Sequence, residues 1–195
     1  LTNNNSLGIS GGTDIYNYRL TYSNTFQQGI LHNTDYERHN IGFNGSAKLS
    51  DKLSTSVSFS YADINMNTAH EGSRAFEGQN PYATAIQAPN TVDYRQVRDY
   101  TSPFHDLDGW YGSYSHNPYR ILNTFTNNGK RSNWLGSASI DWKPIENLTL
   151  ATKLGINYTT LDRIESIPIY QYSDHYWWGD NLQLNGPRSR DGNAG

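Results

Sequence analysis

Two stretches of this chain combine aromatic and polar residues in a way that suits carbohydrate binding. They are DGWYGSYSHNPY (residues 108–119) and YQYSDHYWWGDN (residues 170–181). An aromatic face packs against the C–H groups of a sugar ring, and the polar edge of Tyr or Trp can form a hydrogen bond. Both stretches therefore predict contacts with a bound solute, and packing among loop residues is the alternative. The candidates are Trp110, Tyr111, Tyr114, Tyr176, Trp177 and Trp178.

Carboxylates lie close to histidines in HDLDG (105–109) and SDHYWWGD (173–180). A Ca²⁺ site needs six to eight oxygen ligands, and these stretches contain only part of such a loop. No cofactor is therefore predicted, and Ca²⁺ bound by one of these loops is the alternative. Paired carboxylates could in principle hydrolyse a glycosidic bond, but nothing predicts a rigid element to hold them. Nucleophile-elbow, zincin and P-loop motifs are absent, so the chain is not expected to be an enzyme.

The composition is polar without being highly charged. Of the 195 residues only 17% are charged, against about 25% in typical soluble domains, and 35% are hydrophobic. Mean hydropathy is −0.78, and no apolar run approaches the length of a transmembrane helix. The net charge of −3 and the lack of a basic stripe argue against nucleic acid as a partner. Without Cys, neither disulfides nor thiolate metal sites can form.

The stretch DKLSTSVSFSYAD (51–63) alternates between apolar and small polar residues. A period of two predicts a strand with one apolar face and one polar face. Five other stretches show the same period. The predicted strands cover residues of about 2–10, 15–26, 37–49, 53–63, 132–143 and 148–160.

The connections between these strands alternate in length. Residues 11–14, 50–52 and 144–147 predict tight turns, whereas 28–36, 64–131 and the region after 161 are long. Short and long connections therefore lie at opposite ends of the predicted sheet. This sorting is typical of outer-membrane β-barrels, which have short periplasmic turns and long extracellular loops.

The positions of the aromatic residues agree with a membrane-spanning barrel. On the apolar face they gather near both ends of the strands, as in the aromatic girdles of lipid-facing surfaces. The core of a β-sandwich is the alternative place for this face. The residues predicted to face lipid are Leu20, Tyr22, Phe43, Val57, Phe59, Tyr61, Ile140, Trp142, Leu154, Ile156 and Tyr158.

Several pieces of the chain, in this order and spacing, resemble the SusC/RagA-like TonB-linked outer-membrane transporters of the Bacteroidetes. They are SGGTDIYNY, QQGILHNTDYERHNIGFN, LSDKLSTSVSFSY, NPYATAIQAPNTV, HNPYRIL and LGSASIDWKPIENLTLATKLGINY. The resemblance implies an all-β, antiparallel, membrane-spanning barrel of 22 strands, closed by a plug domain. About six of those strands would lie in this chain, with 64–131 as a long extracellular loop.

The resemblance also implies partners and a location. These are the lipid of the outer membrane of a Gram-negative bacterium, a SusD-like surface lipoprotein, and an oligosaccharide or peptide as substrate. The TonB complex would contact parts of the protein outside this chain, which is expected to be an internal piece of the barrel. Two alternatives remain open at this point: a secreted carbohydrate-binding β-sandwich, and an outer-membrane adhesin that does not transport.

Overall fold

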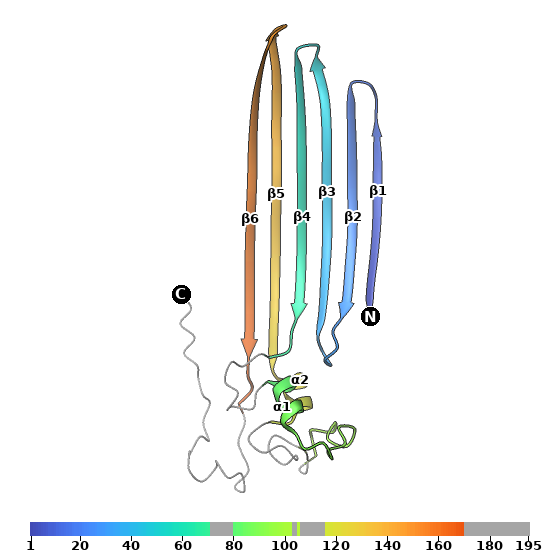
Figure 1. Cartoon of the computed structure of the whole chain (residues 1–195), viewed down its shortest axis with the longest axis vertical. Coiled ribbons are helices and arrows are strands. Elements are labelled where there is room, and N and C mark those ends of the chain that lie inside the picture. The colour runs from blue at the N-terminus through green and yellow to red at the C-terminus, as the bar shows by residue number, and fades with distance from the viewer. Residues whose placement is uncertain (71–79, 103–104, 106–115, 170–195) are drawn as a thin grey trace. The chain divides into compact units, whose positions relative to one another are not determined.

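The computed structural model describes residues 1–70, 80–102, 105 and 116–169. Its main feature is one sheet of six strands, in which each strand lies beside its neighbours in chain order (Figure 1). The predicted all-β class, the six strands and their antiparallel order are confirmed. The strands are β1 (Thr2–Gly12), β2 (Tyr16–Gln28), β3 (Asp35–Ser50), β4 (Leu53–Asn67), β5 (Thr126–Ile145) and β6 (Leu148–Ser166).

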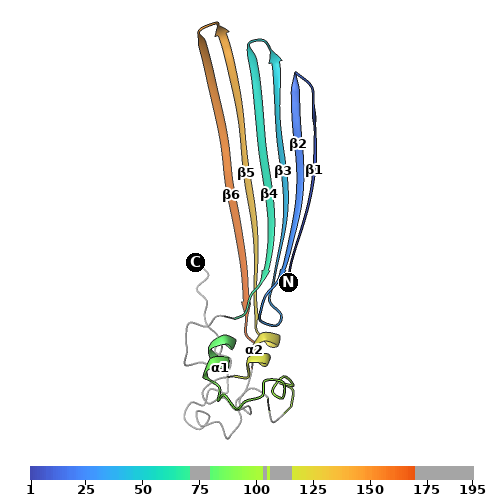
Figure 2. The ribbon, with the colours of Figure 1, turned by 45° about the vertical axis from the view of Figure 1, so that its right-hand side comes forward.

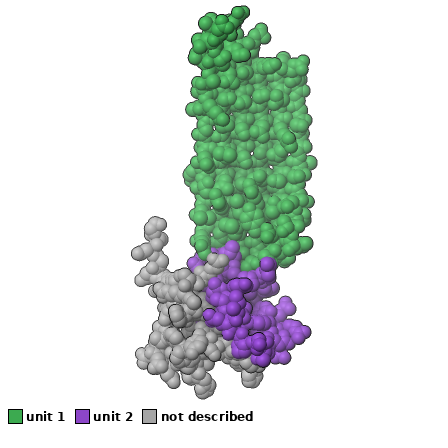
Figure 3. Space-filling model, viewed as in Figure 1, with its two compact units in different colours: residues 1–29, 34–67, 128–163 green, residues 30–33, 68–127, 164–195 purple. Residues whose placement is uncertain are grey.

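The chain forms two compact units, which are described separately (Figure 3). Unit 1 comprises residues 1–29, 34–67 and 128–163, and it is the sheet. Unit 2 comprises residues 30–33, 68–127 and 164–195. It contains two short helices, α1 (Pro81–Gln87) and α2 (Pro118–Thr124). Neither helix has the length or the apolar character needed to span a membrane, and this holds for every described helix.

The strands are longer than the sequence pattern predicts. β4 continues to Asn67 and β5 begins at Thr126, so strand structure occupies both ends of the predicted 64–131 excursion. These extensions pair with each other, because Asn67 lies opposite Asn128. Backbone ladders do not require apolar side chains, so the strands continue after the apolar alternation has stopped.

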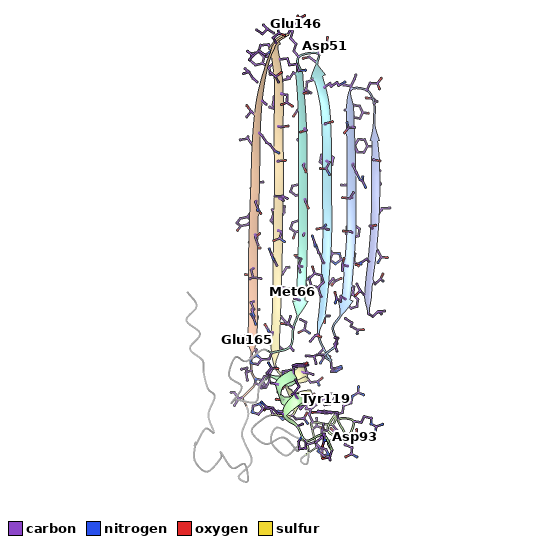
Figure 4. The ribbon with its side chains drawn as sticks, in the orientation of Figure 1. Asp51, Met66, Asp93, Tyr119, Glu146 and Glu165 are labelled. Atoms are coloured by element: carbon purple, nitrogen blue, oxygen red, sulfur yellow. The ribbon has the colours of Figure 1, made fainter. Side chains whose placement is uncertain are left out.

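Tight turns join the strands at one end of the sheet, where Figure 4 labels Asp51 and Glu146. In the first turn, the Thr13 N–H donates to the carbonyl of Tyr16 at 2.7 Å. This close approach requires glycine at position 12, because a Cβ atom there would lie 2.5 Å from the same carbonyl oxygen. In the second turn, the Lys52 N–H donates to Ser50 Oγ at 3.2 Å. Met66 is labelled at the opposite end, from which the longer connections leave.

The tips of the three hairpins are staggered along the sheet, as Figures 1 and 2 show. Tyr16, which follows the first turn, pairs with Ala47, whereas β3 continues to Ser50. Leu53, which follows the second turn, pairs with Trp142, whereas β5 continues to Ile145. Each hairpin thus extends roughly 10 Å beyond the preceding one, over two strand spacings of about 4.8 Å each. Such tips become level when the strands are tilted by about 45°, which is close to the tilt in transmembrane barrels.

In unit 2, both helices begin at an Asn-Pro pair. Asn80 Oδ1 accepts hydrogen bonds from the backbone N–H groups of Tyr82 and Ala83 at 3.0 and 3.1 Å. Asn117 caps α2 in the same way, through the N–H of Tyr119 at 2.9 Å. Proline at a first helical position predicts a short helix over residues 81–88 that Pro89 would end, and α1 agrees with this prediction. The second helix was missed, although HNPYRIL carries the same Asn-Pro signal.

Candidate functional site

The register brings the residues predicted to face lipid onto one face of the sheet. Leu20 pairs with Phe43, and Phe43 pairs with Phe59. Residues directly opposite each other in an antiparallel ladder point to the same side. The remaining rows extend this face across the four strands from β2 to β5. They are Tyr22–Ile41–Tyr61–Trp134, Tyr18–Gly45–Val57–Ala138, Tyr16–Ala47–Thr55–Ile140 and Leu53–Trp142.

β6 continues the same apolar face. A Cβ atom on Gly136 would lie 3.0 Å from Ile156 Cγ2, which places Ile156 on the apolar side. Thr159 Oγ1 donates to Asn133 Oδ1 at 3.1 Å on the other side. Since successive side chains of a strand point to opposite faces, Leu154 and Tyr158 lie on the same apolar face as Ile156. All eleven residues therefore lie on one face of the sheet, and their contact with lipid remains a prediction.

Aromatic rings cluster where this face ends toward the long connections. The ring centroids of Tyr61 and Trp134 lie 4.3 Å apart, and those of Phe59 and Trp134 lie 5.9 Å apart. The Tyr22 hydroxyl forms a 2.9 Å hydrogen bond with His39 Nδ1, and His39 Nε2 lies 3.0 Å from Glu37 Oε1. The row of rings therefore separates an apolar band from a polar zone, as the aromatic girdle of a membrane protein does.

A second set of aromatic residues lies toward the tight turns. It consists of Tyr16, Tyr18 and Trp142. Tyr18 lies in the row of Ala138, four residues from Trp142 along β5. At the opposite end of the face, the row of Phe26 reaches Lys130 on β5. Phe26 therefore lies four residues from the row of Trp134, and the offset has the same direction as that of Tyr18 from Trp142. Phe26 was not predicted as part of this face, although it lies at an alternate position of β2 in line with Tyr22.

The apolar face is exposed or half-exposed across the sheet. The exposed fractions are 43% for Val57, 51% for Ile140 and 71% for Leu154. Large contiguous apolar surfaces are rare on monomeric soluble proteins and mark a surface that another phase or molecule covers. This face therefore needs an apolar cover, such as lipid or a second protein layer.

The opposite face is lined by small polar side chains that bond to one another. Ser56 Oγ and Ser139 Oγ lie 2.7 Å apart, and the Ser58 hydroxyl donates to Asn44 Oδ1 at 2.8 Å. Side chains that satisfy one another in this way suit a surface in contact with water. Such a surface fits the prediction of a polar barrel interior.

Unit 2 has its own small core around buried polar residues. The Asn117 side chain is fully buried, and its amide donates to the carbonyls of Val97 and His105 while its oxygen caps α2. His70 Nδ1 lies 2.8 Å from Glu165 Oε1. Burial lowers the pKa of His116 to about 3, and the positive charge of Arg120 acts in the same direction. His116 is therefore neutral at physiological pH.

The six aromatic residues predicted to contact a bound solute lie outside the described residues. They are Trp110, Tyr111, Tyr114, Tyr176, Trp177 and Trp178. Of the two stretches weighed for Ca²⁺, only His105 is described, so that expectation stays untested. Within the described ranges, no three His, Asp or Glu side chains are grouped so that they could hold a metal ion.

The chain is similar to a protein named TonB-dependent receptor P26 from Formosa agariphila. The two are 27% identical over 143 residues, which is 73% of this chain and 13% of that protein. The chain therefore spans about one eighth of the length of this relative. No family model matches the chain. The similarity supports the TonB-dependent transporter family in general.

Proposed function

We propose that this chain is part of the wall of an outer-membrane TonB-dependent transporter that takes up nutrients into a Gram-negative bacterium. The observation that carries the proposal is the exposed apolar face, which is bounded by aromatic residues at both ends and backed by a neutral polar face. Lipid covers such a face, while water in the lumen solvates the other. The hairpin stagger and the similarity to a TonB-dependent receptor support the same assignment.

The finer parts of the proposal rest on the resemblance to SusC/RagA-like transporters. The six strands form part of a 22-stranded barrel, and the long connections lie on the extracellular side with a SusD-like lipoprotein above them. The substrate is an oligosaccharide or a peptide. The aromatic side chains that contact it are those of Trp110, Tyr111, Tyr114, Tyr176, Trp177 and Trp178. TonB engages other parts of the protein. The chain has no catalytic role and no cofactor in this proposal.

The test is the behaviour of the full-length protein in the cell envelope. We expect it to sediment with the outer membrane, to require detergent for extraction, and to migrate faster on gels before boiling than after. We also expect its uptake of nutrient to stop in cells that lack TonB. If the protein remains soluble and monomeric without detergent, the transporter assignment fails and a β-sandwich becomes the better explanation. Outer-membrane insertion without any loss of uptake on deletion of its gene would favour an adhesin.

A further inference from the structure

Charged residues are divided unequally between the two faces of the sheet in unit 1. Register and alternation place seven cationic side chains and one carboxylate on the polar face, and four carboxylates and one lysine on the apolar side, mostly beyond the aromatic row. The charged residues of the polar face are Arg19, Arg38, Lys48, Arg131, Lys143, Lys153, Arg163 and Asp141. Those of the other face are Asp35, Glu37, Asp63, Asp162 and Lys130. The polar face is therefore strongly electropositive, although the whole chain carries a net charge of −3.

Two of these cations form a pair near the end from which the long connections leave. Arg38 and Arg131 both pair with Ile64, so they lie in one row on three neighbouring strands. Their Cα atoms are thus separated by two strand spacings, or about 10 Å. The Arg38 guanidinium donates to Asn40 Oδ1 at 3.2 Å, and Arg131 Nε donates to Asn133 Oδ1 at 3.0 Å. Both guanidinium groups are therefore oriented along their strands toward the tight turns.

The cations of this face are available to a ligand. Arg19, Arg38, Lys48, Arg131 and Lys153 are all exposed. Among the described residues, none of these five makes an ion pair with a carboxylate. The amide oxygens that hold Arg38 and Arg131 are neutral, so the guanidinium charges are not cancelled locally.

We propose that the polar face binds a solute with several negative charges, and that Arg38 and Arg131 are its principal contacts. The inference rests on the proposed function and adds a substrate class to it. Guanidinium groups bind carboxylate and sulfate oxygens through paired, charge-assisted hydrogen bonds. A wall of one charge sign also concentrates the oppositely charged solute in the channel.

The alternative occupant is an acidic segment of the same protein that docks permanently on this face. The arrangement of the cations favours a passing solute. They extend from Lys48 and Lys143 near the tight turns, through Lys153 and Arg19, to the Arg38–Arg131 row. Neutral hydroxyl and amide groups such as Ser58 and Asn44 lie between them. Transport needs several moderate sites in series, whereas a fixed contact needs one compact patch.

The test is solute binding by the full-length protein in detergent. Four probes would be compared by calorimetry at two salt concentrations: oligogalacturonate, a maltooligosaccharide of equal length, an acidic oligoglutamate peptide, and a neutral oligoglutamine peptide of equal length. We expect an anionic probe to bind more tightly than its neutral counterpart, and more weakly at high salt. The saccharide and peptide arms identify which source supplies the anion.

The decisive variants remove positive charge from opposite faces of the sheet, two charges in the arginine pair and one in the lysine control. Arg38→Gln with Arg131→Gln should weaken binding of the preferred anionic probe by about tenfold or more, since the charge-assisted hydrogen bonds of both guanidinium groups are lost. Lys130→Gln removes the same charge from the adjacent residue on the opposite face, and it should leave binding unchanged. Circular dichroism and outer-membrane yield would confirm that each variant folds.

Three results would overturn the inference. The anionic probes could bind no better than the neutral ones, or Lys130→Gln could weaken binding as much as the arginine pair. The arginine variant could instead open an ion-conducting pore in a planar bilayer without changing anion affinity, which would assign the face to an internal acidic segment. In each case the proposed function would stand if the protein still inserts into the outer membrane and imports a neutral nutrient. Loss of membrane insertion by the unmodified protein would instead refute the proposed function.

Discussion

Substitution of Val57 by Arg tests whether the apolar face contacts lipid. Val57 lies four residues from Tyr61, which pairs with Trp134, and four residues from Leu53, which pairs with Trp142. At about 3.4 Å per residue and a tilt of about 45°, it is roughly 10 Å below either boundary of the apolar band. An arginine side chain that snorkels cannot fully span that depth. We therefore expect Val57→Arg to destabilise the protein folded in lipid by about 2–4 kcal/mol, which is the cost of an arginine at the bilayer midplane.

The control is the adjacent residue, which faces the other way. Ser58 donates one exposed hydrogen bond to Asn44, so Ser58→Arg should cost only about 0.5–1.5 kcal/mol. Each variant of the full-length protein would be folded into phospholipid vesicles across a urea series. The folded fraction would be read from the difference in gel migration between unboiled and boiled samples. Equal effects at the two positions, or a larger effect at Ser58, would refute the assignment of the faces.

Three further predictions concern the turns and unit 2. Gly12→Ala should destabilise the first hairpin by about 1–3 kcal/mol, because its Cβ atom would crowd the Tyr16 carbonyl, whereas Gly8→Ala has room and should be neutral in the same vesicle assay. Asn117→Ala should cost about 2–4 kcal/mol, since the buried Val97 carbonyl and the partly buried His105 carbonyl lose a donor along with the helix cap. Asn80→Ala should cost only about 1 kcal/mol in cap energy. The two variants would be measured by hydrogen exchange in residues 116–127 and 81–88, respectively. The pKa of His116 is about 3 in the folded protein and near 6.5 in the unfolded chain. As the pH falls, the unfolded state therefore takes up a proton before the folded state does. Unit 2 should lose stability as the pH falls from about 6.5 toward 3. Exchange rates corrected for intrinsic pH effects should show this loss, and His116→Gln should flatten it; an unchanged slope in that variant would contradict the assignment.

The strand positions could be predicted because alternation over a half-apolar strand is a local signal. Residues from Leu53 to Tyr61 alternate without interruption, and all of them lie in β4. The strand ends could not be located in this way. From Asp35 to His39 and from Asn65 to Asn67 the face that is apolar elsewhere carries only polar residues, so the apolar alternation stops there although the backbone ladder continues.

The candidate sites were predictable to different degrees. Face membership follows from parity within each strand, which is why the predicted apolar residues share one face. The Arg38–Arg131 pair could not be found from the sequence, because the two residues are 93 positions apart and only the register of β4 brings them into one row. The α2 helix was predictable from its Asn-Pro start, but its short length and polar composition give little periodic signal.

The offsets of the aromatic residues provide a second measure of strand tilt that is independent of the turns. Tyr18 lies four residues from the row of Trp142, and Phe26 lies four residues from the row of Trp134, in the same direction and across the same three strand steps. Four residues of rise, about 14 Å, over three spacings, also about 14 Å, correspond to a tilt of about 45°. The hairpin tips give nearly the same angle. The turns and these two aromatic pairs are inclined alike to the strands, although Tyr22 shares the row of Tyr61 and Trp134. A bilayer imposes planar boundaries on a lipid-facing sheet, whereas the core of a sandwich has no such requirement. If substitutions at Tyr18 and Phe26 proved equivalent in depth to those at Trp142 and Trp134 in a lipid-quencher fluorescence assay, this geometry would be established directly; a depth difference of four residues would instead place the strands upright.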